Sequence, residues 1–320
     1  MIDRSHFFPQ ADVARDVTIV TVAFDNAEYL IQNAAFVRYF NRGDLPRWII
    51  VDNSPKPLIW AGLPSWIEVV PGVSPVRGRD RGSLHHAMGL EEGLRHVHTR
   101  YVLLMDPDFY VIRKHWLIDL AQHISQRRLA LFGSMWHPKW HYQYRYFPSV
   151  HFMWIDGGQL PLESIDLKPR IHVDLWWRLI NQGIWPMPVR KTLQVMRIRD
   201  TGWSLYQRVR GIPTLAYECL IPHFVPDGSL RYQFEVALRP LLPEFLCLYP
   251  KDESHQTAKT YLKNDLPEAF AAGWEEFFWG GRPFAFHLRQ VGRLGVGHST
   301  NMDLPLLKKA FNHYRKEEPS

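Results

Sequence analysis

Cysteine is scarce in this chain of 320 residues, which has only Cys219 and Cys247. Two cysteines exclude a disulfide-stapled scaffold and a cysteine-rich zinc site, and they suit a reducing compartment. Long apolar runs are also absent, since no segment approaches the roughly 18 uninterrupted apolar residues of a spanning helix. The opening MIDRSHFFPQ carries charges and a proline where a signal peptide has its apolar region. We therefore expect a cytoplasmic protein without a transmembrane segment.

The chain also lacks any block of like charge. It has 38 Lys and Arg against 32 Asp and Glu, a net charge of +6, and the basic residues are dispersed. This excess favours an anionic partner, such as a sugar nucleotide, a membrane surface or a nucleic acid, and an ordinary solvated surface is an equal alternative. With 46% hydrophobic and 14% aromatic residues, the composition is globular and excludes a disordered chain.

Apolar β-branched runs alternate with helical patterns over the first 130 residues. The patterns predict strands at 17–23, 48–51, 66–70 and 101–105 and helices at 26–40 and 82–98. This alternation predicts an α/β fold, with a Rossmann-like, mostly parallel sheet and helices on both of its faces.

The second half is less regular. It predicts a strand at 129–135, a pocket-lining loop at 136–151 with a strand into Asp156, helices at 171–182 and 201–210, and an extended segment at 214–220. Proline-bounded pieces follow from about 240. We expect a catalytic domain over 1–240, with a nucleotide-binding half at 1–130 and an acceptor half at 131–240, and a C-terminal extension at 241–320 packed on it.

Two carboxylates follow the predicted strand at 101–105. Asp106 and Asp108 flank Pro107, which fixes the backbone φ and stiffens the turn. Ligands of parallel α/β sheets bind at the carboxyl ends of the strands. Two carboxylates there can hold a hard divalent cation against a diphosphate. A plain turn with helix capping is the alternative.

Four segments together resemble the nucleotide-sugar glycosyltransferases with the A-type fold, in particular family 2. They are VTIVTVAFDN (17–26), IIVDNSP (49–55), the glycine- and arginine-containing loop and helix at 78–98, and YVLLMDPDFYV (101–111). The resemblance implies an A-type fold and a nucleotide-sugar donor. It covers the first 110 residues well and continues more weakly to about 225.

The resemblance also implies roles for single residues. Ala23, Phe24 and Asp52 would contact the base, Asp106 the ribose or the metal, and Asp108 the metal. Asp52 has an alternative as the first residue of an Asx turn. Arg79, at a helix entrance with Arg81, would neutralise the diphosphate, or it lies in a solvated loop.

Two further acids and two histidines complete the candidate site. DTGWSLYQRVRG (200–211) is similar to the family's acidic motif, so Asp200 would deprotonate the acceptor, although an Asp before Thr-Gly also suits a helix N-cap. Asp156 in WIDGG is the substitute base. His223 and His287 are the candidates for a histidine ligand of the metal.

Together with these residues, the resemblance implies a hexosyltransferase that uses Mn²⁺ or Mg²⁺ and inverts the anomeric carbon. The donor is a nucleotide sugar, first of all a UDP-sugar, and the acceptor is a glycan or a lipid-linked glycan, with peripheral contact to the inner face of a membrane. One alternative acceptor is a hydroxylated base in DNA, stacked by the aromatic loop at 136–151. The other alternative is an inactive nucleotide-sugar-binding or scaffolding protein.

Overall fold

The computed structural model describes most of the chain, including every candidate carboxylate of the site. The described residues are 14–42, 45–60, 63–75, 81–136, 146–169, 200–220, 222–223, 233, 237–238, 240–241, 260–288 and 303–316. The helix expected at 171–182 lies outside these residues. Among the described helices, none has both the length and the apolar character needed to cross a membrane.

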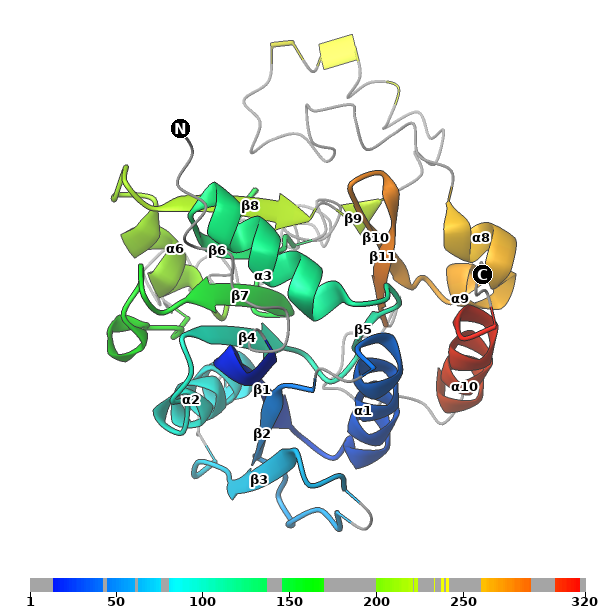
Figure 1. Cartoon of the computed structure of the whole chain (residues 1–320), viewed down its shortest axis with the longest axis horizontal. Coiled ribbons are helices and arrows are strands. Elements are labelled where there is room, and N and C mark those ends of the chain that lie inside the picture. The colour runs from blue at the N-terminus through cyan, green and yellow to red at the C-terminus, as the bar shows by residue number, and fades with distance from the viewer. Residues whose placement is uncertain are drawn as a thin grey trace, which may run out of the picture.

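A seven-stranded sheet forms the centre of the molecule, in the order β3-β2-β1-β4-β7-β6-β8 (Figure 1). Its strands are β1 (Val17–Ala23), β2 (Arg47–Asp52), β3 (Ile67–Pro71), β4 (Tyr101–Met105), β6 (Leu129–Ser134), β7 (Phe152–Asp156) and β8 (Ala216–Leu220). All neighbouring pairs are parallel except those of β7, which runs antiparallel to β4 and β6. The predicted mixed α/β fold with a mostly parallel sheet is confirmed.

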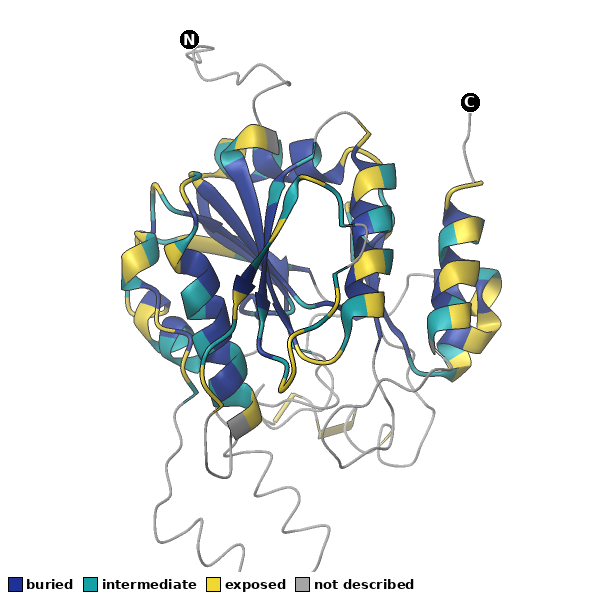
Figure 2. Ribbon diagram, turned by 90° about the horizontal axis from the view of Figure 1, so that it is seen from below, coloured by how far each residue is buried: buried dark blue, intermediate teal, exposed yellow. Residues whose placement is uncertain are grey.

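Helices cover both faces of this sheet. They are α1 (Ala27–Phe40), α2 (Arg81–Arg95), α3 (Trp116–Arg127) and α6 (Trp203–Val209). Three further helices follow in the described chain, α8 (Tyr261–Asp265), α9 (Pro267–Ala271) and α10 (Asp303–Tyr314). Short 3₁₀ turns occupy Ala14–Asp16 and Leu162–Ser164. One buried cluster joins the sheet to α1, α3 and α10, and a second joins it to α2 and α6. The central strands β1, β4, β7 and β6 are therefore buried at every position, whereas the edge strands β3 and β8 are partly exposed (Figure 2).

Two glycines let α2 approach the sheet closely. A Cβ at Gly93 would lie 2.4 Å from the side chain of Val20, and one at Gly89 would lie 2.9 Å from that of Val22. Real Cβ atoms do not come so near, so these positions require glycine. Because they are four residues apart, both lie on the face of α2 that contacts β1.

A second, smaller sheet flanks the end of β4. Its order is β5-β11-β10-β9, with β5 (Phe109–Val111), β11 (Arg282–His287), β10 (Glu275–Trp279) and β9 (Pro222–His223), all antiparallel. Residues after 260 thus pair with β5 and share a hydrophobic cluster with α1 and β1. The sequence patterns did not predict this sheet, and the domain boundary near 240 stays a prediction.

Candidate active site

The site lies at the edge where the parallel strands of the large sheet end. Ala23 and Asp52 are register partners at the ends of β1 and β2, and Asp106 follows the end of β4. Because β7 is antiparallel, its first residue lies at this same edge, opposite Met105. His151, one position before β7, is thereby brought beside Asp106.

Backbone hydrogen bonds fix Asp106 between these segments. Its N–H donates to the His151 carbonyl at 2.9 Å, and its carbonyl accepts from the Phe109 N–H at 3.2 Å. The second bond closes the tight turn that carries Asp106 and Asp108 into β5. Both carboxylates therefore project from a constrained backbone rather than from a long loop.

Asn33 of α1 braces the same turn and was not found from the sequence. Its side-chain amide donates to the carbonyls of Pro107 at 3.2 Å and of Phe109 at 2.9 Å, and Asn33 is fully buried. On the other side, the Leu288 N–H donates to the Asp108 carbonyl at 3.0 Å. The turn is thus held from both α1 and the end of β11.

Two histidines face Asp106. His86 Nε2 lies 3.5 Å from Oδ1, and His151 Nε2 lies 3.7 Å from Oδ2. Burial lowers the pKa of His86 to about 4, although the negative charges of Asp200 and Asp108 oppose this shift. His86 is therefore neutral at pH 7 and can accept or donate a hydrogen bond at this edge.

His287 lies between two other acids. Its Nε2 is 3.3 Å from Asp108 Oδ1, and its Nδ1 is 3.1 Å from Glu275 Oε2. Strand pairing explains this arrangement of Asp108, His287 and Glu275. His287 is the register partner of Phe109 on β5 and of Glu275 on β10. Directly opposed residues share one face of an antiparallel sheet. The small sheet thus delivers His287 and Glu275 to the carboxylate turn.

The acids and His287 shift one another's protonation. Burial and then the charge of Asp108 raise the pKa of Asp106 to about 8, with a further upward contribution from Asp200 and opposition from His287. Burial by itself would lower the pKa of His287, but Asp108 and Glu275 outweigh it and raise that pKa to about 10. The site therefore has a surplus of negative charge that a cation would neutralise.

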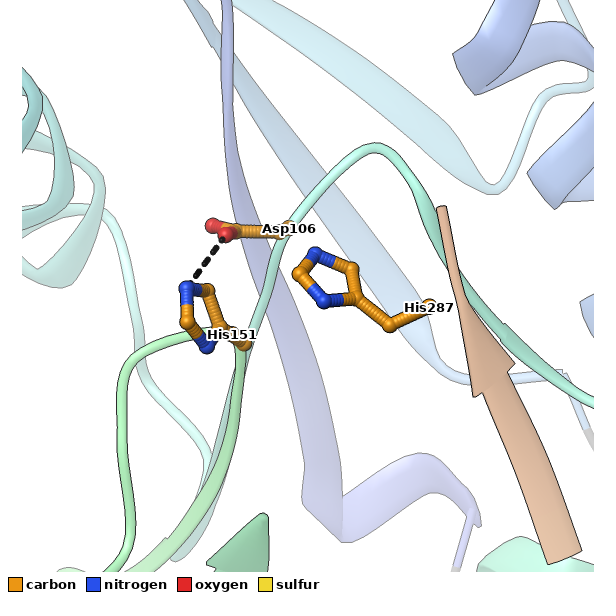
Figure 3. A group of neighbouring side chains, drawn as sticks. All are labelled: Asp106, His151 and His287. Carbon is orange, nitrogen blue, oxygen red and sulfur yellow. Dashed lines mark ion pairs between the residues drawn. The ribbon is translucent and has the colours of Figure 1, made fainter. Parts of the chain in front are cut away.

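Three of these side chains fit a metal ion. Asp106, His151 and His287 each offer one donor atom, and the three atoms lie within 4.8 Å of one another (Figure 3). Asp108 adds a carboxylate against Nε2 of His287. Carboxylate and imidazole donors together suit divalent first-row metals such as Mn²⁺. The donor set therefore fits the cation that the sequence led us to expect.

Asp200 lies close enough to this group for its charge to act on both Asp106 and His86. The alternative role of Asp200 as a helix N-cap is wrong. The N-cap of α6 is Gly202, in the left-handed region at φ 91°, and this residue makes no side-chain capping hydrogen bond. Asp200 instead accepts the Thr201 N–H at Oδ1, at 2.7 Å. Its carboxylate is therefore held beside the cluster by a local bond.

The predicted nucleoside contacts lie along the strand ends. Ala23 is buried and Phe24 is 41% exposed. Asp52 Oδ1 accepts the Ser54 N–H at 3.0 Å, and Oδ2 accepts the Leu58 N–H at 2.8 Å. The Asx turn named as an alternative for Asp52 is therefore present, and its contact with a base stays a prediction.

Asp156 does not lie with these residues. It is the register partner of Tyr101, the first residue of β4, so it lies at the opposite edge of the sheet from Asp106. Arg100 donates to both of its oxygens at 2.9 Å, and Gln159 and Gly158 also donate to it. Asp156 as substitute base is therefore a wrong expectation, because the direction of β7 places it away from the site.

His223 and Arg79 are the two remaining candidates from the sequence. His223 lies on β9, the outermost strand of the small sheet, with its ring 5.4 Å from that of Phe278. It is not in the group of described residues that could hold a metal ion, whereas His287 is. Arg79 lies outside the described residues, so its contact with a diphosphate stays a prediction.

We expect Asp156→Asn to destabilise the protein and leave its chemistry intact. The change removes the charge that Arg100 binds, and hydrogen bonds to charged groups contribute about 1.5–3 kcal/mol each. Although burial opposes it, bonding from Arg100 lowers the pKa of Asp156. Its stabilisation is therefore present above about pH 4, the ordinary range of an aspartate, and is lost as the pH falls through the lowered value. Urea unfolding of the wild type and the variant at pH 7 and pH 3 measures the loss of stability and its dependence on pH. Equal stabilities of the two proteins at pH 7 would contradict the expectation.

Among known proteins, similarity to this chain was found only in solved structures. No protein-family model matches the chain, and no curated protein matches it. The mannosyltransferase PcManGT of Pyrobaculum calidifontis, solved with GDP-Man and Mn²⁺, is 14% identical over 73% of this chain and 64% of its own, with a TM-score of 0.34. The galactosyltransferase LgtC, solved with donor and acceptor sugar analogues, is 16% identical over 68% and 81%, with a TM-score of 0.38.

A third similar structure covers much less. A fragment of S. aureus TarS, residues 1–349 with UDP-GlcNAc, is 15% identical over 38% of this chain, with a TM-score of 0.28. The chain spans 34% of that fragment's length. Likeness at these levels says nothing about the reaction of this chain, which has to be argued from its own residues.

Proposed function

We propose that this protein is a metal-dependent glycosyltransferase of the A-type fold that takes a sugar from a nucleotide-sugar donor. The observation that carries the proposal is the grouping of Asp106, Asp108, His287 and Asp200 at the carboxyl edge of the sheet. That edge is where nucleotide ligands bind in open α/β sheets. The motif resemblance at 17–26, 49–55 and 101–111 supports the same reading.

In this proposal the donor lies across the ends of β1, β2 and β4. Ala23, Phe24 and Asp52 contact the nucleoside, and a UDP-sugar is the first donor to test. Asp106, Asp108 and His287 would hold a divalent cation. When bound, that cation stabilises the negative charge that develops on the leaving diphosphate.

The chain's own residues would complete a direct displacement. Asp200 accepts the proton of the acceptor hydroxyl, whose oxygen forms the new bond to the anomeric carbon. The bond from that carbon to the diphosphate oxygen breaks at the same time, and its electron pair leaves with the nucleoside diphosphate. Attack opposite the leaving group inverts the anomeric carbon. His86 Nε2 lies 3.5 Å from Asp106 Oδ1, and because burial lowers its pKa to about 4, this ring adds no positive charge at the edge at pH 7.

The acceptor in this proposal is a glycan or lipid-linked glycan hydroxyl. The DNA alternative depended on the aromatic and basic loop at 136–151, of which residues 137–145 lie outside the described part. Nothing in the described residues favours that acceptor, and it is not proposed.

Donor binding is tested by thermal unfolding with a panel of nucleotide sugars, each with Mn²⁺ or with EDTA. A true donor at 100 times its dissociation constant stabilises the folded protein by about 2.7 kcal/mol. Such a stabilisation corresponds to a rise in Tm of roughly 4 °C for a chain of this size. We expect a UDP-sugar to give this rise with Mn²⁺ and much less with EDTA.

Free sugars and nucleoside monophosphates are the controls of the panel, since neither carries the diphosphate that the cation would bind. A rise in Tm with Mn²⁺ alone reports the cation site only. If no nucleotide sugar adds to the effect of Mn²⁺, the proposed donor class is wrong. If a UDP-sugar binds equally well in EDTA, the donor class stands and metal-dependent binding is wrong.

A further inference from the structure

We propose that His151 is a second imidazole ligand of the cation site, and that Ser149 and Glu275 position the two imidazole rings for the metal. The inference rests on the proposed function for the presence of a cation at Asp106. It goes beyond that function by assigning three residues that neither the strand-end motif nor its resemblance includes. It is tested on the metal alone, without any nucleotide.

The position of His151 is the first observation that supports its role as a ligand. Its Nε2 lies 3.7 Å from Asp106 Oδ2, and its ring centre lies 4.8 Å from that of His287. The donor atoms of Asp106, His151 and His287 all lie within 4.8 Å of one another (Figure 3). Two donors on one cation, with bonds of about 2.1 Å, are roughly 3 Å apart when adjacent and roughly 4.2 Å apart when opposite. Small side-chain rotations therefore bring the three atoms onto one ion.

The oxygen partner of Nδ1 in each ring is the second observation, and it supports the positioning roles of Ser149 and Glu275. His287 Nδ1 lies 3.1 Å from Glu275 Oε2, and His151 Nδ1 lies 3.0 Å from Ser149 Oγ. In the metal-bound state, with the proton on Nδ1, each ring would donate to its oxygen and direct its Nε2 lone pair toward the cation. Ligating histidines usually have such an oxygen partner, which fixes the tautomer and the ring orientation.

The surroundings hold these partners in place. Glu275 is 6% exposed and is paired across the small sheet with His287. Ser149 is 1% exposed, and its N–H donates to the Ser134 carbonyl at 2.6 Å. The Trp136 ring packs edge-on against His151, with centres 4.0 Å apart. Both imidazoles are thus oriented by buried neighbours before any metal arrives.

The donor set has a consequence for metal choice. Mg²⁺ prefers oxygen ligands and keeps several waters, whereas Mn²⁺, Co²⁺ and Zn²⁺ accept imidazole nitrogen readily. Two imidazoles beside the carboxylates should therefore make the site bind these metals more tightly than Mg²⁺. Loss of one imidazole should reduce that preference.

The experiment uses the full chain, stripped with EDTA and dialysed, and titrated with Mn²⁺ while free Mn²⁺ is followed by electron paramagnetic resonance. His151→Ala is expected to weaken Mn²⁺ binding by at least about tenfold, and to weaken Mg²⁺ binding, measured by competition, much less. Spin-echo spectra of bound Mn²⁺ should show coupling to imidazole nitrogen that decreases in the variant. A purely structural effect of His151 would leave this nitrogen signature unchanged.

Two further variants separate positioning from folding. Glu275→Gln keeps an oxygen that accepts from His287 Nδ1, while Glu275→Ala removes it. We expect Glu275→Ala to weaken Mn²⁺ binding by about 10- to 100-fold, as loss of such a partner usually does, and Glu275→Gln to recover most of it. His223→Asn is the matched control, because His223 is a buried histidine of the same small sheet outside the cluster, and its Mn²⁺ affinity should equal that of the wild type.

The outcomes are distinct. If folded His151→Ala binds Mn²⁺ within twofold of the wild type with the same nitrogen signature, His151 is not a ligand. Equal losses in Glu275→Ala and Glu275→Gln would overturn the positioning role of Glu275. If the metal results hold and no nucleotide sugar binds, the proposed function fails while this inference stands. If nucleotide sugars bind and the wild type takes up no Mn²⁺, this inference and the metal dependence of the proposed function are wrong, while the donor class stands.

Discussion

Asp108→Ala is expected to lower the rate of sugar transfer by about a thousandfold. The carboxylate faces His287 Nε2 at 3.3 Å in the proposed cation site. A cation at a leaving diphosphate contributes several kcal/mol to the transition state, and about 4 kcal/mol corresponds to a thousandfold in rate. The rate is measured at saturating nucleotide sugar and Mn²⁺, with the donor found in the thermal panel.

The fold should survive this substitution. The structural contact of Asp108 is its backbone carbonyl, which accepts from the Leu288 N–H at 3.0 Å and is retained by alanine. The Asp108 side chain is 39% exposed, and His287 keeps Glu275 as a partner. We therefore expect a Tm within a few degrees of the wild type.

Asp166→Ala is the matched control for Asp108→Ala. Asp166 is an exposed aspartate whose carboxylate accepts the Lys168 N–H in a surface turn, so its loss should leave the transfer rate unchanged. The metal-dependent mechanism is wrong if Asp108→Ala transfers at the wild-type rate, or if the wild type keeps its full rate in EDTA.

The strands β1, β2 and β4 could be predicted because each is a compact apolar run that is buried on both faces of the sheet. Val17–Ala23 is buried at all seven positions, and Tyr101–Met105 at all five. A buried parallel strand leaves a continuous apolar signal that is local in sequence. The carboxylates after such a strand could therefore be placed at the correct edge.

Strand direction could not be predicted, and Asp156 shows why. An apolar run has the same composition whether its strand is parallel or antiparallel to its neighbours. β7 runs antiparallel to β4 and β6, so Asp156 at its end lies at the edge away from Asp106. The same reversal brings His151, at the start of β7, to the site.

The remaining site residues depend on contacts between distant segments. Asn33 reaches Pro107 over a separation of 74 residues. His287 and Glu275 arrive through pairing of β11 with β5 and β10. A lone histidine or a buried asparagine has no local pattern that marks it as part of a site. The described structure is needed to find them, and one candidate, His287, was named only through the family resemblance.

Asp200→Asn separates the proposed base from a structural residue. Asparagine keeps an oxygen that can accept the Thr201 N–H, the bond that Asp200 makes at 2.7 Å. The cap of α6 is Gly202, so the helix loses nothing. The variant cannot take a proton from the acceptor, and a general base contributes roughly 10²- to 10⁴-fold. We expect an unchanged Tm, normal donor binding and a transfer rate at least about a hundredfold lower.

Asp156→Asn is the control for this variant, because it makes the same chemical change at the opposite edge of the sheet. There the carboxylate binds Arg100, and the expected result is reversed: lower stability with a normal transfer rate for the folded protein. Steady-state rates and urea unfolding of both variants decide the assignment. If Asp200→Asn transfers within a few-fold of the wild type, Asp200 is not the base. A lower rate in Asp156→Asn at full folding would mean that the opposite edge affects the reaction.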